Sequence, residues 1–309
     1  METLILITCL LVAVFLLSWY RRRPAIPNEM FLSLPGFKPN LYWLVDAEPN
    51  ARHWWDFQGR RSDTPNRGYL EVALDRVFQT QSDDFNVVPL IGRMATMMAI
   101  DGAHPRAIDL PPALWRSYVI SALCARRGGL VMDGNSVLVL GKSFSPVVSN
   151  KSAAMFGADH DEVVVSPNAI SPGPDNYIGW AAAAGHPAWM ASYKAYEKVV
   201  AAGAQAWTAA IARRMPRGLW EEQKRAGMEC VRAADGSRLP DGSLRQLEDY
   251  FGRKHDVDDP KQAVSDNALY VVYDGDALER RFEFNWFLRL SKEQLKGTDL
   301  MWSHMAGLM

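Results

Sequence analysis

The chain has 309 residues and a formal net charge of -1 at neutral pH. This length suits one large α/β domain or two small ones, and the balanced charge excludes a typical nucleic-acid-binding protein. Apolar residues make up 48% of the chain, which contains 11 tryptophans, so a well-filled core is expected and a disordered chain is excluded. The three cysteines lack metal-type spacing, and this sparse, odd count favours reducing surroundings over a disulfide framework.

An uncharged apolar segment covers residues 4–20 and is followed at once by three arginines, residues 21–23. The segment is slightly shorter than the roughly 20 residues that cross a bilayer core, but Trp19 and Tyr20 suit the headgroup interface. The alternative is a cleaved signal peptide, which would need a basic start and a small-residue cleavage site. We expect an uncleaved single-pass membrane anchor over residues 1–23, with the globular domain on the cytosolic side.

A proline-rich linker over residues 24–40 joins this anchor to a domain expected over residues 41–309. The domain begins with a short apolar run over residues 41–46, which predicts a buried first strand. Helical spacing over residues 69–79 and a second strand-like run over residues 84–90 follow. Strand, helix and strand in this order predict a βαβ unit, and therefore a parallel sheet with a right-handed crossover.

The rest of the chain alternates in the same way. Pro111 and Pro112 suit the first turn of the helix expected over residues 111–127, and Gly128 and Gly129 suit its end. The expected helices cover residues 91–100, 111–127 and 188–214, and the expected strands cover residues 130–140, 163–165, 177–180 and 269–273. We therefore expect an α/β fold with a mostly parallel sheet flanked by helices, behind an N-terminal transmembrane helix.

One stretch combines a Gly-Gly turn, an apolar strand and an acid. Gly128 and Gly129 end the preceding helix, and Asp133 and Asn135 lie in the strand-like run that follows. A carboxylate at the edge of a sheet can hold a divalent metal against a diphosphate. The alternative is a strand that ends in an Asp-Gly turn and re-enters as a second strand. These residues alone leave both interpretations open.

A wider pattern surrounds this stretch. It consists of a buried strand through Trp43, the Gly-Gly-x-x-x-Asp-x-Asn stretch, and a helix that Gly185-His186-Pro187 opens, over roughly residues 40–210. The pattern resembles the GT-A glycosyltransferases with a DXD sugar-binding region, especially the capsular-polysaccharide-synthesis and initiation-mannosyltransferase-like families. The resemblance implies a GT-A-like (Rossmann-like) fold. It also implies transfer of a hexose, with retention, from a nucleotide sugar to a glycan or lipid-linked acceptor near the membrane, as in polysaccharide biosynthesis.

The resemblance also implies the roles of individual residues. Asp133 and Asn135 match the two acids that grip Mn²⁺ or Mg²⁺, and the neutral Asn135 is expected to weaken that grip. Arg116 and the arginine-rich loop over residues 52–67 are expected to offset phosphate charge. The expected donor-binding residues are Trp43, Asp46, Arg116, Asp133 and His304, and the expected catalytic or acceptor-contacting residues are Asp175 and Asn176.

Two polar positions of the family pattern are vacant, since Ser117 and Ile120 stand where it has an acid and an arginine. Arg116 lies one turn before Ile120 and could reach the same place; alternatively, it snorkels to the surface past the core. The vacancies leave a second hypothesis open, in which the chain is a catalytically inactive, membrane-tethered structural or binding protein.

Every other candidate also has a structural alternative. Asp274-Gly275-Asp276 reads as a complete Asp-x-Asp motif after a strand, but a hairpin turn is favoured here. Asp175 and Asn176 suit an Asx-turn as well as an acceptor contact. Asp46 can simply end a strand, and His186 before Pro187 is expected to cap a helix rather than take part in chemistry.

Overall fold

A computed structural model describes residues 38–46, 67–157, 178–212, 225–231, 236–252, 256, 258 and 263–309. In the part of the chain that it describes, six strands form one mixed, mostly parallel sheet in the order β2-β1-β3-β6-β5-β7. Strand β6 runs antiparallel to both of its neighbours, and the other pairs are parallel. The strands are β1 (Asn40–Val45), β2 (Asn86–Ile91), β3 (Gly129–Asp133), β5 (Ala153–Phe156), β6 (Ile178–Ala181) and β7 (Glu229–Val231).

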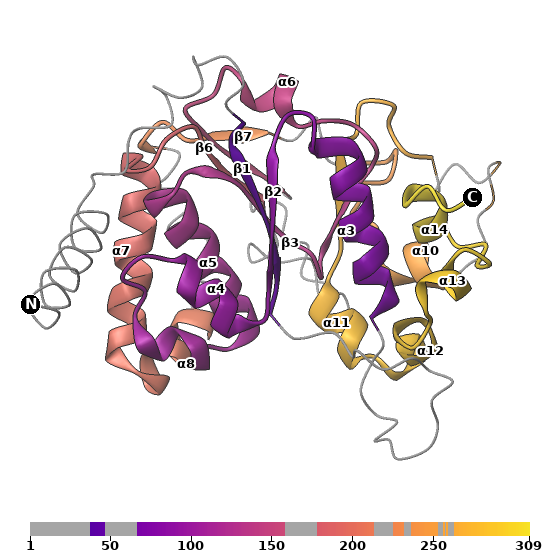
Figure 1. The fold of residues 1–309 in the computed structure, drawn as a ribbon. Helices are drawn as coiled ribbons and strands as arrows, with labels where there is room; N and C mark the ends of the chain where they lie inside the picture. Colours follow the sequence, from indigo (N-terminus) through magenta and orange to yellow (C-terminus); the bar gives the residue numbers. More distant parts are fainter. Residues whose placement is uncertain are drawn as a thin grey trace, which may run out of the picture.

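Helices cover both faces of the sheet, which confirms the expected α/β class (Figure 1). Helices α5 (Pro112–Arg126) and α7 (Pro187–Ala202) lie on one face, and α3 (Gly68–Gln81) with the C-terminal helices lies on the other. Each side has its own buried apolar cluster, and the sheet separates the two clusters. This three-layer arrangement hides both faces of the central strands.

The predicted βαβ unit is confirmed: β1 and β2 pair in parallel, with α3 between them in the chain. Strand β2 is an edge strand, and for this reason it tolerates Pro89, which has no N–H to donate to a neighbour. On the other side of β1, Leu44 pairs with Asp133 of β3. The carboxyl ends of β1, β2 and β3 therefore meet at one edge of the sheet.

The Gly-Gly pair is required where α5 turns into β3. Gly128 and Gly129 both have positive φ angles, of 70° and 96°, which other residues rarely adopt. A side chain on Gly129 would also place its Cβ 2.4 Å from the Asn40 carbonyl oxygen. The predicted helix over residues 111–127 is thus confirmed, together with the reason for its end.

Two expected elements are each divided in the structure. The single helix expected over residues 188–214 is α7 followed by α8 (Ala204–Ala212), because Gly203 between them has a φ of 87° that breaks the helix. The single strand expected over residues 130–140 ends at Asp133, and β4 (Val137–Val139) begins after a turn. Strand β4 pairs with β8 (Tyr270–Val272) instead of with β3.

The remaining helices of the described residues are short. They are α4 (Arg93–Ala99), η1 (Pro105–Asp109), α6 (Ser145–Val148), α10 (Leu247–Phe251), α11 (Gly275–Arg280), η3 (Phe282–Phe284), α12 (Asn285–Leu288), α13 (Lys292–Leu295) and α14 (Met301–Met305). Among the described residues no helix has the length and apolar character to cross a membrane. The predicted anchor and linker, the strand over residues 163–165, the arginine-rich loop up to residue 66, and the candidates Asp175 and Asn176 all lie outside the described residues.

Candidate functional site

A cluster of charged side chains lies where β1 and β3 end and α11 begins. The β-register places Asp133 beside Leu44, and Asp46 follows the end of β1. Helix α11 is brought to the same edge because the Gly275 N–H donates to Ser136 Oγ at 3.3 Å. A Cβ on Gly275 would lie 2.4 Å from the Asn135 carbonyl oxygen, so this approach requires glycine.

Arg116 is the centre of the cluster. Its two terminal nitrogens donate to the two carboxylate oxygens of Asp276 at 2.9 and 2.6 Å. Its Nε lies 3.3 Å from Asp133 Oδ2. Only 2% of the arginine side chain is exposed, against 2% for Asp133 and 24% for Asp276. The guanidinium therefore joins one fully buried carboxylate to one that reaches solvent, with the planar geometry that suits a bidentate pair.

The two carboxyl groups differ in their pKa values. Burial raises the pKa of Asp133 to about 6, although the charge of Arg116 acts to lower it. Burial also acts to raise the pKa of Asp276, but the hydrogen bond and charge of Arg116 outweigh it, so that this pKa lies below its ordinary value. Two neighbouring carboxyl groups whose environments separate their pKa values are a feature of functional sites.

Asn135 joins this pair to a second one. Its backbone N–H donates to Asp133 Oδ1 at 3.1 Å, and its side-chain amide donates to Asp46 Oδ1 at 3.2 Å. The other Asp46 oxygen lies 3.4 Å from Arg93 Nη2. Asn135 Oδ1 is buried and has no hydrogen-bond partner in the part of the chain that the structure describes. This oxygen is left to accept from, or to coordinate, something else.

The structure brings together four of the predicted site residues: Asp46, Arg116, Asp133 and Asn135. The interpretation of Arg116 as a surface residue that snorkels past the core is wrong, because its guanidinium is buried against Asp133 and Asp276. The idea that Arg116 replaces the arginine missing at Ile120 stays a prediction. Ser117 and Ile120 themselves are fully buried.

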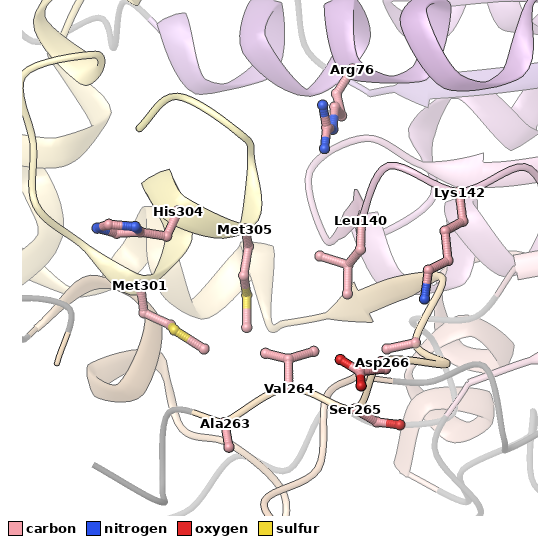
Figure 2. Close-up of a pocket in the computed structure, with 11 residues that line it drawn as sticks. Arg76, Leu140, Lys142, Ala263, Val264, Ser265, Asp266, Met301, His304 and Met305 are labelled. Carbon is pink, nitrogen blue, oxygen red and sulfur yellow. The ribbon is translucent and has the colours of Figure 1, made fainter. Parts of the chain in front are cut away.

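Other predicted residues lie elsewhere. Trp43 belongs to the buried core, and its ring lies beneath the turn, so that a Cβ on Gly134 would be 2.5 Å from it. His304 is on α14, where its Nε2 pairs with Asp299 Oδ1 at 2.9 Å. It lines a pocket that contains none of the clustered acids (Figure 2). His186 occupies the N-cap position of α7, but its side chain does not cap the helix.

The hairpin turn predicted for Asp274-Gly275-Asp276 is wrong. Asp274 is the N-cap of α11, and its Oδ1 accepts the Ala277 N–H at 2.8 Å. Asp276 in the first turn then points its carboxylate at Arg116. The signal was present in the sequence, because an Asp followed by Gly-Asp-Ala-Leu-Glu-Arg is a regular helix start.

A second ion pair borders the cluster and was also missed. Arg67, just before α3, lies 3.1 Å from Glu279 of α11, and the Tyr69 hydroxyl lies 3.4 Å from the same carboxylate. Burial raises the pKa of Glu279, the charge of Arg67 opposes this, and the charges of Asp46 and Asp276 add to it. These couplings place Glu279 near the clustered acids.

Comparisons with protein families, with curated proteins and with solved structures found no match to this chain. Among the described residues, no group of three or more His, Cys, Asp or Glu side chains is arranged to hold a metal ion. Any ion bound here would take its remaining ligands from Asn135, from water or from a substrate.

Proposed function

We propose that this chain is a glycosyltransferase that moves a hexose from a nucleotide sugar to a glycan or lipid-linked acceptor, with retention at the anomeric carbon. The resemblance of the sequence to GT-A glycosyltransferases supports the reaction class. The observation that carries the proposal is the position of Arg116 between Asp133 and Asp276. These residues gather at the carboxyl edge of a mostly parallel sheet, which is where α/β sheets bind their ligands.

The charge of the cluster bears on how a nucleotide diphosphate could bind. Three carboxylates, Asp46, Asp133 and Asp276, face two guanidinium groups, Arg93 and Arg116, so three negative and two positive charges leave one net negative charge. By themselves these five side chains would not attract a diphosphate. A divalent cation would offset the repulsion, and Mg²⁺ sites commonly use one or two carboxylates together with substrate phosphates.

The donor set fits Mn²⁺ or Mg²⁺, and it refines the expected ligands. Asn135 supplies a buried oxygen that has no partner among the described residues, and the Asp46 and Asp276 side chains reach solvent. Asp133 is enclosed and already faces Arg116. We therefore propose Asn135 with Asp46 or Asp276 as ligands and Asp133 as the residue that positions Arg116. Such an ion would neutralise charge on the departing diphosphate.

Hydrogen bonds hold the side chains of Arg116 and Arg93 in fixed positions. Arg116 cannot swing toward a phosphate, because both of its carboxylate partners hold it. It instead sets the orientation of Asp276 at the open side of the cluster. Arg93 is held by the carbonyl oxygens of Ile108 and Leu110 while it pairs with Asp46. The predictions for Asp175 and Asn176 as acceptor contacts, and for a cytosolic domain behind a single-pass anchor, belong to the same proposal.

One observation favours a second candidate function, that of a catalytically inactive membrane-tethered binding protein. Arg116 is a permanent cation that engages two of the three acids of the cluster. A site whose acids are neutralised in this way needs no metal ion to be stable. In that case Asn135, Asp46 and Asp276 would form a structural network only.

Thermal unfolding of the full-length chain separates the two functions. The chain is titrated with UDP-sugars and GDP-sugars, with and without Mn²⁺. A ligand that binds only the native state stabilises it by about 2.7 kcal/mol at 100 times its dissociation constant. The glycosyltransferase proposal expects a shift that requires Mn²⁺ for at least one sugar nucleotide. Absence of a shift with every nucleotide would contradict it.

Variants then locate the metal ligands. Either Asp276→Asn or Asp46→Asn should abolish the Mn²⁺-dependent part of the shift, because the acid that binds the ion loses its charge. Asp133→Asn should reduce nucleotide binding while some metal dependence remains, since Asp133 acts through Arg116. The matched control is Asp101→Asn, which removes an acid that pairs with Arg127 on the surface. If Asp133→Asn alone removed the metal dependence, Asp133 itself would be the ligand.

A further inference from the structure

A cavity lies at the other end of the β4–β8 ladder from the charged cluster. Gly275 and Ser136 meet at the cluster end, whereas the Leu140 N–H donates to the Leu269 carbonyl at the far end. Beyond that far end is a cavity of about 480 Å³, lined by residues of α3, of the segment after β4, of the segment before β8 and of α14. This volume is in the range of small-molecule sites.

One part of the cavity wall is apolar, and another part is charged. Leu140, Val264, Met301 and Met305 supply an apolar surface, and Figure 2 shows Met305 and Val264 directed toward each other across it. Arg76 of α3 and Lys142 of the segment after β4 supply positive charge. Asp266 is the acid of the lining, and within the described residues it forms no ion pair with either cation.

Within the part of the chain that the structure describes, Arg76 has a fixed position but no counter-ion. A Cβ on Gly141 would lie 2.5 Å from its Nη2, and a Cβ on Gly307 would lie 3.0 Å from its Nη1, so two glycines make room for the guanidinium. Its Nε is buried and has no hydrogen-bond partner, and Arg76 forms no ion pair within the described residues. A partly desolvated cation without a partner is unfavourable, and a bound anion would remove that penalty.

We propose that this cavity binds an organic anion with an apolar body, such as an alkyl phosphate or a fatty carboxylate. The acidic group faces Arg76 and Lys142, and the apolar body packs on the methionines, Leu140 and Val264. The proposal does not depend on the glycosyltransferase function, because the cavity shares no residue with the Arg116 cluster. The same chemistry can come from a free amphiphile or from an anionic lipid in a bilayer.

The test uses 8-anilinonaphthalene-1-sulfonate, an aromatic anion whose fluorescence rises in apolar surroundings, and dodecyl phosphate as competitor. The full-length chain should bind the dye, and dodecyl phosphate should displace it, whereas inorganic phosphate should not. Arg76→Met keeps an apolar stem and removes the charge, and it should weaken binding about tenfold or more, as loss of a charged hydrogen bond does. Lys142→Met should act in the same direction and provides a second variant if the first unfolds.

The control variant is Lys296→Met, which removes one exposed positive charge of the same C-terminal region outside the cavity. Dye binding unchanged by both Arg76→Met and Lys142→Met would overturn the proposal. Displacement of the dye by inorganic phosphate would contradict the part of the proposal that requires an apolar body in the ligand. Vesicles of phosphatidylcholine with and without phosphatidic acid identify the source. If the acidic vesicles displace the dye from the wild type but not from Arg76→Met, the ligand is a bilayer lipid. If dodecyl phosphate displaces the dye and the vesicles do not, the ligand is a free amphiphile.

Discussion

At the scale of the residue, Arg116 determines the character of the charged cluster. It joins α5 to α11 across 160 positions of the chain, and it is the nearest cation to the enclosed Asp133. A buried ion pair adds little stability compared with apolar residues of the same shape, but removal of one partner leaves an uncompensated charge. The arginine therefore fixes the positions of the two carboxylates, and its loss is expected to destabilise the fold.

Arg116→Met should lower the free energy of unfolding by about 3–5 kcal/mol at neutral pH, because Asp133 would stay buried without its cation. Urea denaturation followed by tryptophan fluorescence measures this loss. The matched control is Arg127→Met, whose pair with Asp101 is exposed at 43% and 70%. That change should cost less than about 1 kcal/mol. Equal losses for the two variants would contradict the buried pair.

The raised pKa of Asp133 gives a second prediction at this scale. The carboxyl has a pKa of about 6 in the native state because burial outweighs the charge of Arg116, against about 3.9 in an unfolded chain. The native state thus binds this proton more tightly between those values. The stabilisation is fully present below about pH 4 and is lost as the pH rises through about 6.

The measurement compares the free energy of unfolding of the wild type and of Asp133→Asn across this pH range. The wild-type value minus the variant value should fall between about pH 4 and pH 6 and then remain constant. The subtraction is needed because the lowered pKa of Asp276 acts in the opposite direction. A difference that rises with pH would show that Arg116 dominates the pKa of Asp133.

At the scale of the element, α11 positions the Asp276 side chain in the charged cluster. The helix is short, so its first turn and its cap decide where the carboxylate lies. Asp274 supplies that cap, and Gly275 permits close contact with Asn135. Helix α5 on the other side is buried along nearly its whole length, and this burial excludes water from Arg116.

Asp274→Ala should cost about 0.5–2 kcal/mol of unfolding free energy, since the Ala277 N–H loses its acceptor. Asp274→Asn retains a capping oxygen and should cost clearly less. Both are measured by urea denaturation. The same pair should differ in Mn²⁺-dependent nucleotide binding, because a frayed α11 no longer holds Asp276. An Asn variant as unstable as the Ala variant would mean that charge, and not capping, is the function of Asp274.

At the scale of the whole molecule, the C-terminal helices share a core with the sheet. Trp302 of α14 is fully buried, and its ring lies 6.4 Å from Tyr69 of α3 and 5.3 Å from Phe287 of α12. Residues of β1, β3 and β8 belong to the same apolar cluster. Because the two regions share one core, they are expected to unfold together.

Trp302→Ala should therefore lower the stability of the whole molecule by about 3–5 kcal/mol through the cavity that it leaves. Urea denaturation should still show one transition, whether it is followed by fluorescence or by circular dichroism. Phe282→Ala is the control, because 85% of that residue is exposed, and surface changes usually stay within about 0.5 kcal/mol. A separate early transition in Trp302→Ala would show that the C-terminal helices form an independent unit.

Local chemistry in the sequence by itself determined much of this fold. The βαβ unit, the helix over residues 112–126 and its glycine end follow from apolar spacing, prolines and positive φ angles, which act over a few neighbouring residues. The same signals placed Asp46 after the first strand, but the pairing of β1 with β3 that brings Asp46 to Asp133 and Asn135 joins distant segments and was not encoded locally. These predictions succeeded because strand and helix periods are local properties of a chain.

Tertiary structure alone decided the rest. The antiparallel direction of β6, the pairing of β4 with β8, and the ion pair between Arg116 and Asp276 each join segments that are distant in the sequence. No local period encodes such partners: the residues around Asp274 signal a helix start, but they do not name the partner of the Asp276 carboxylate. Its role was decided by the contact of Gly275 with the turn after β3, because only that contact brings a solvent-facing carboxylate to a buried arginine.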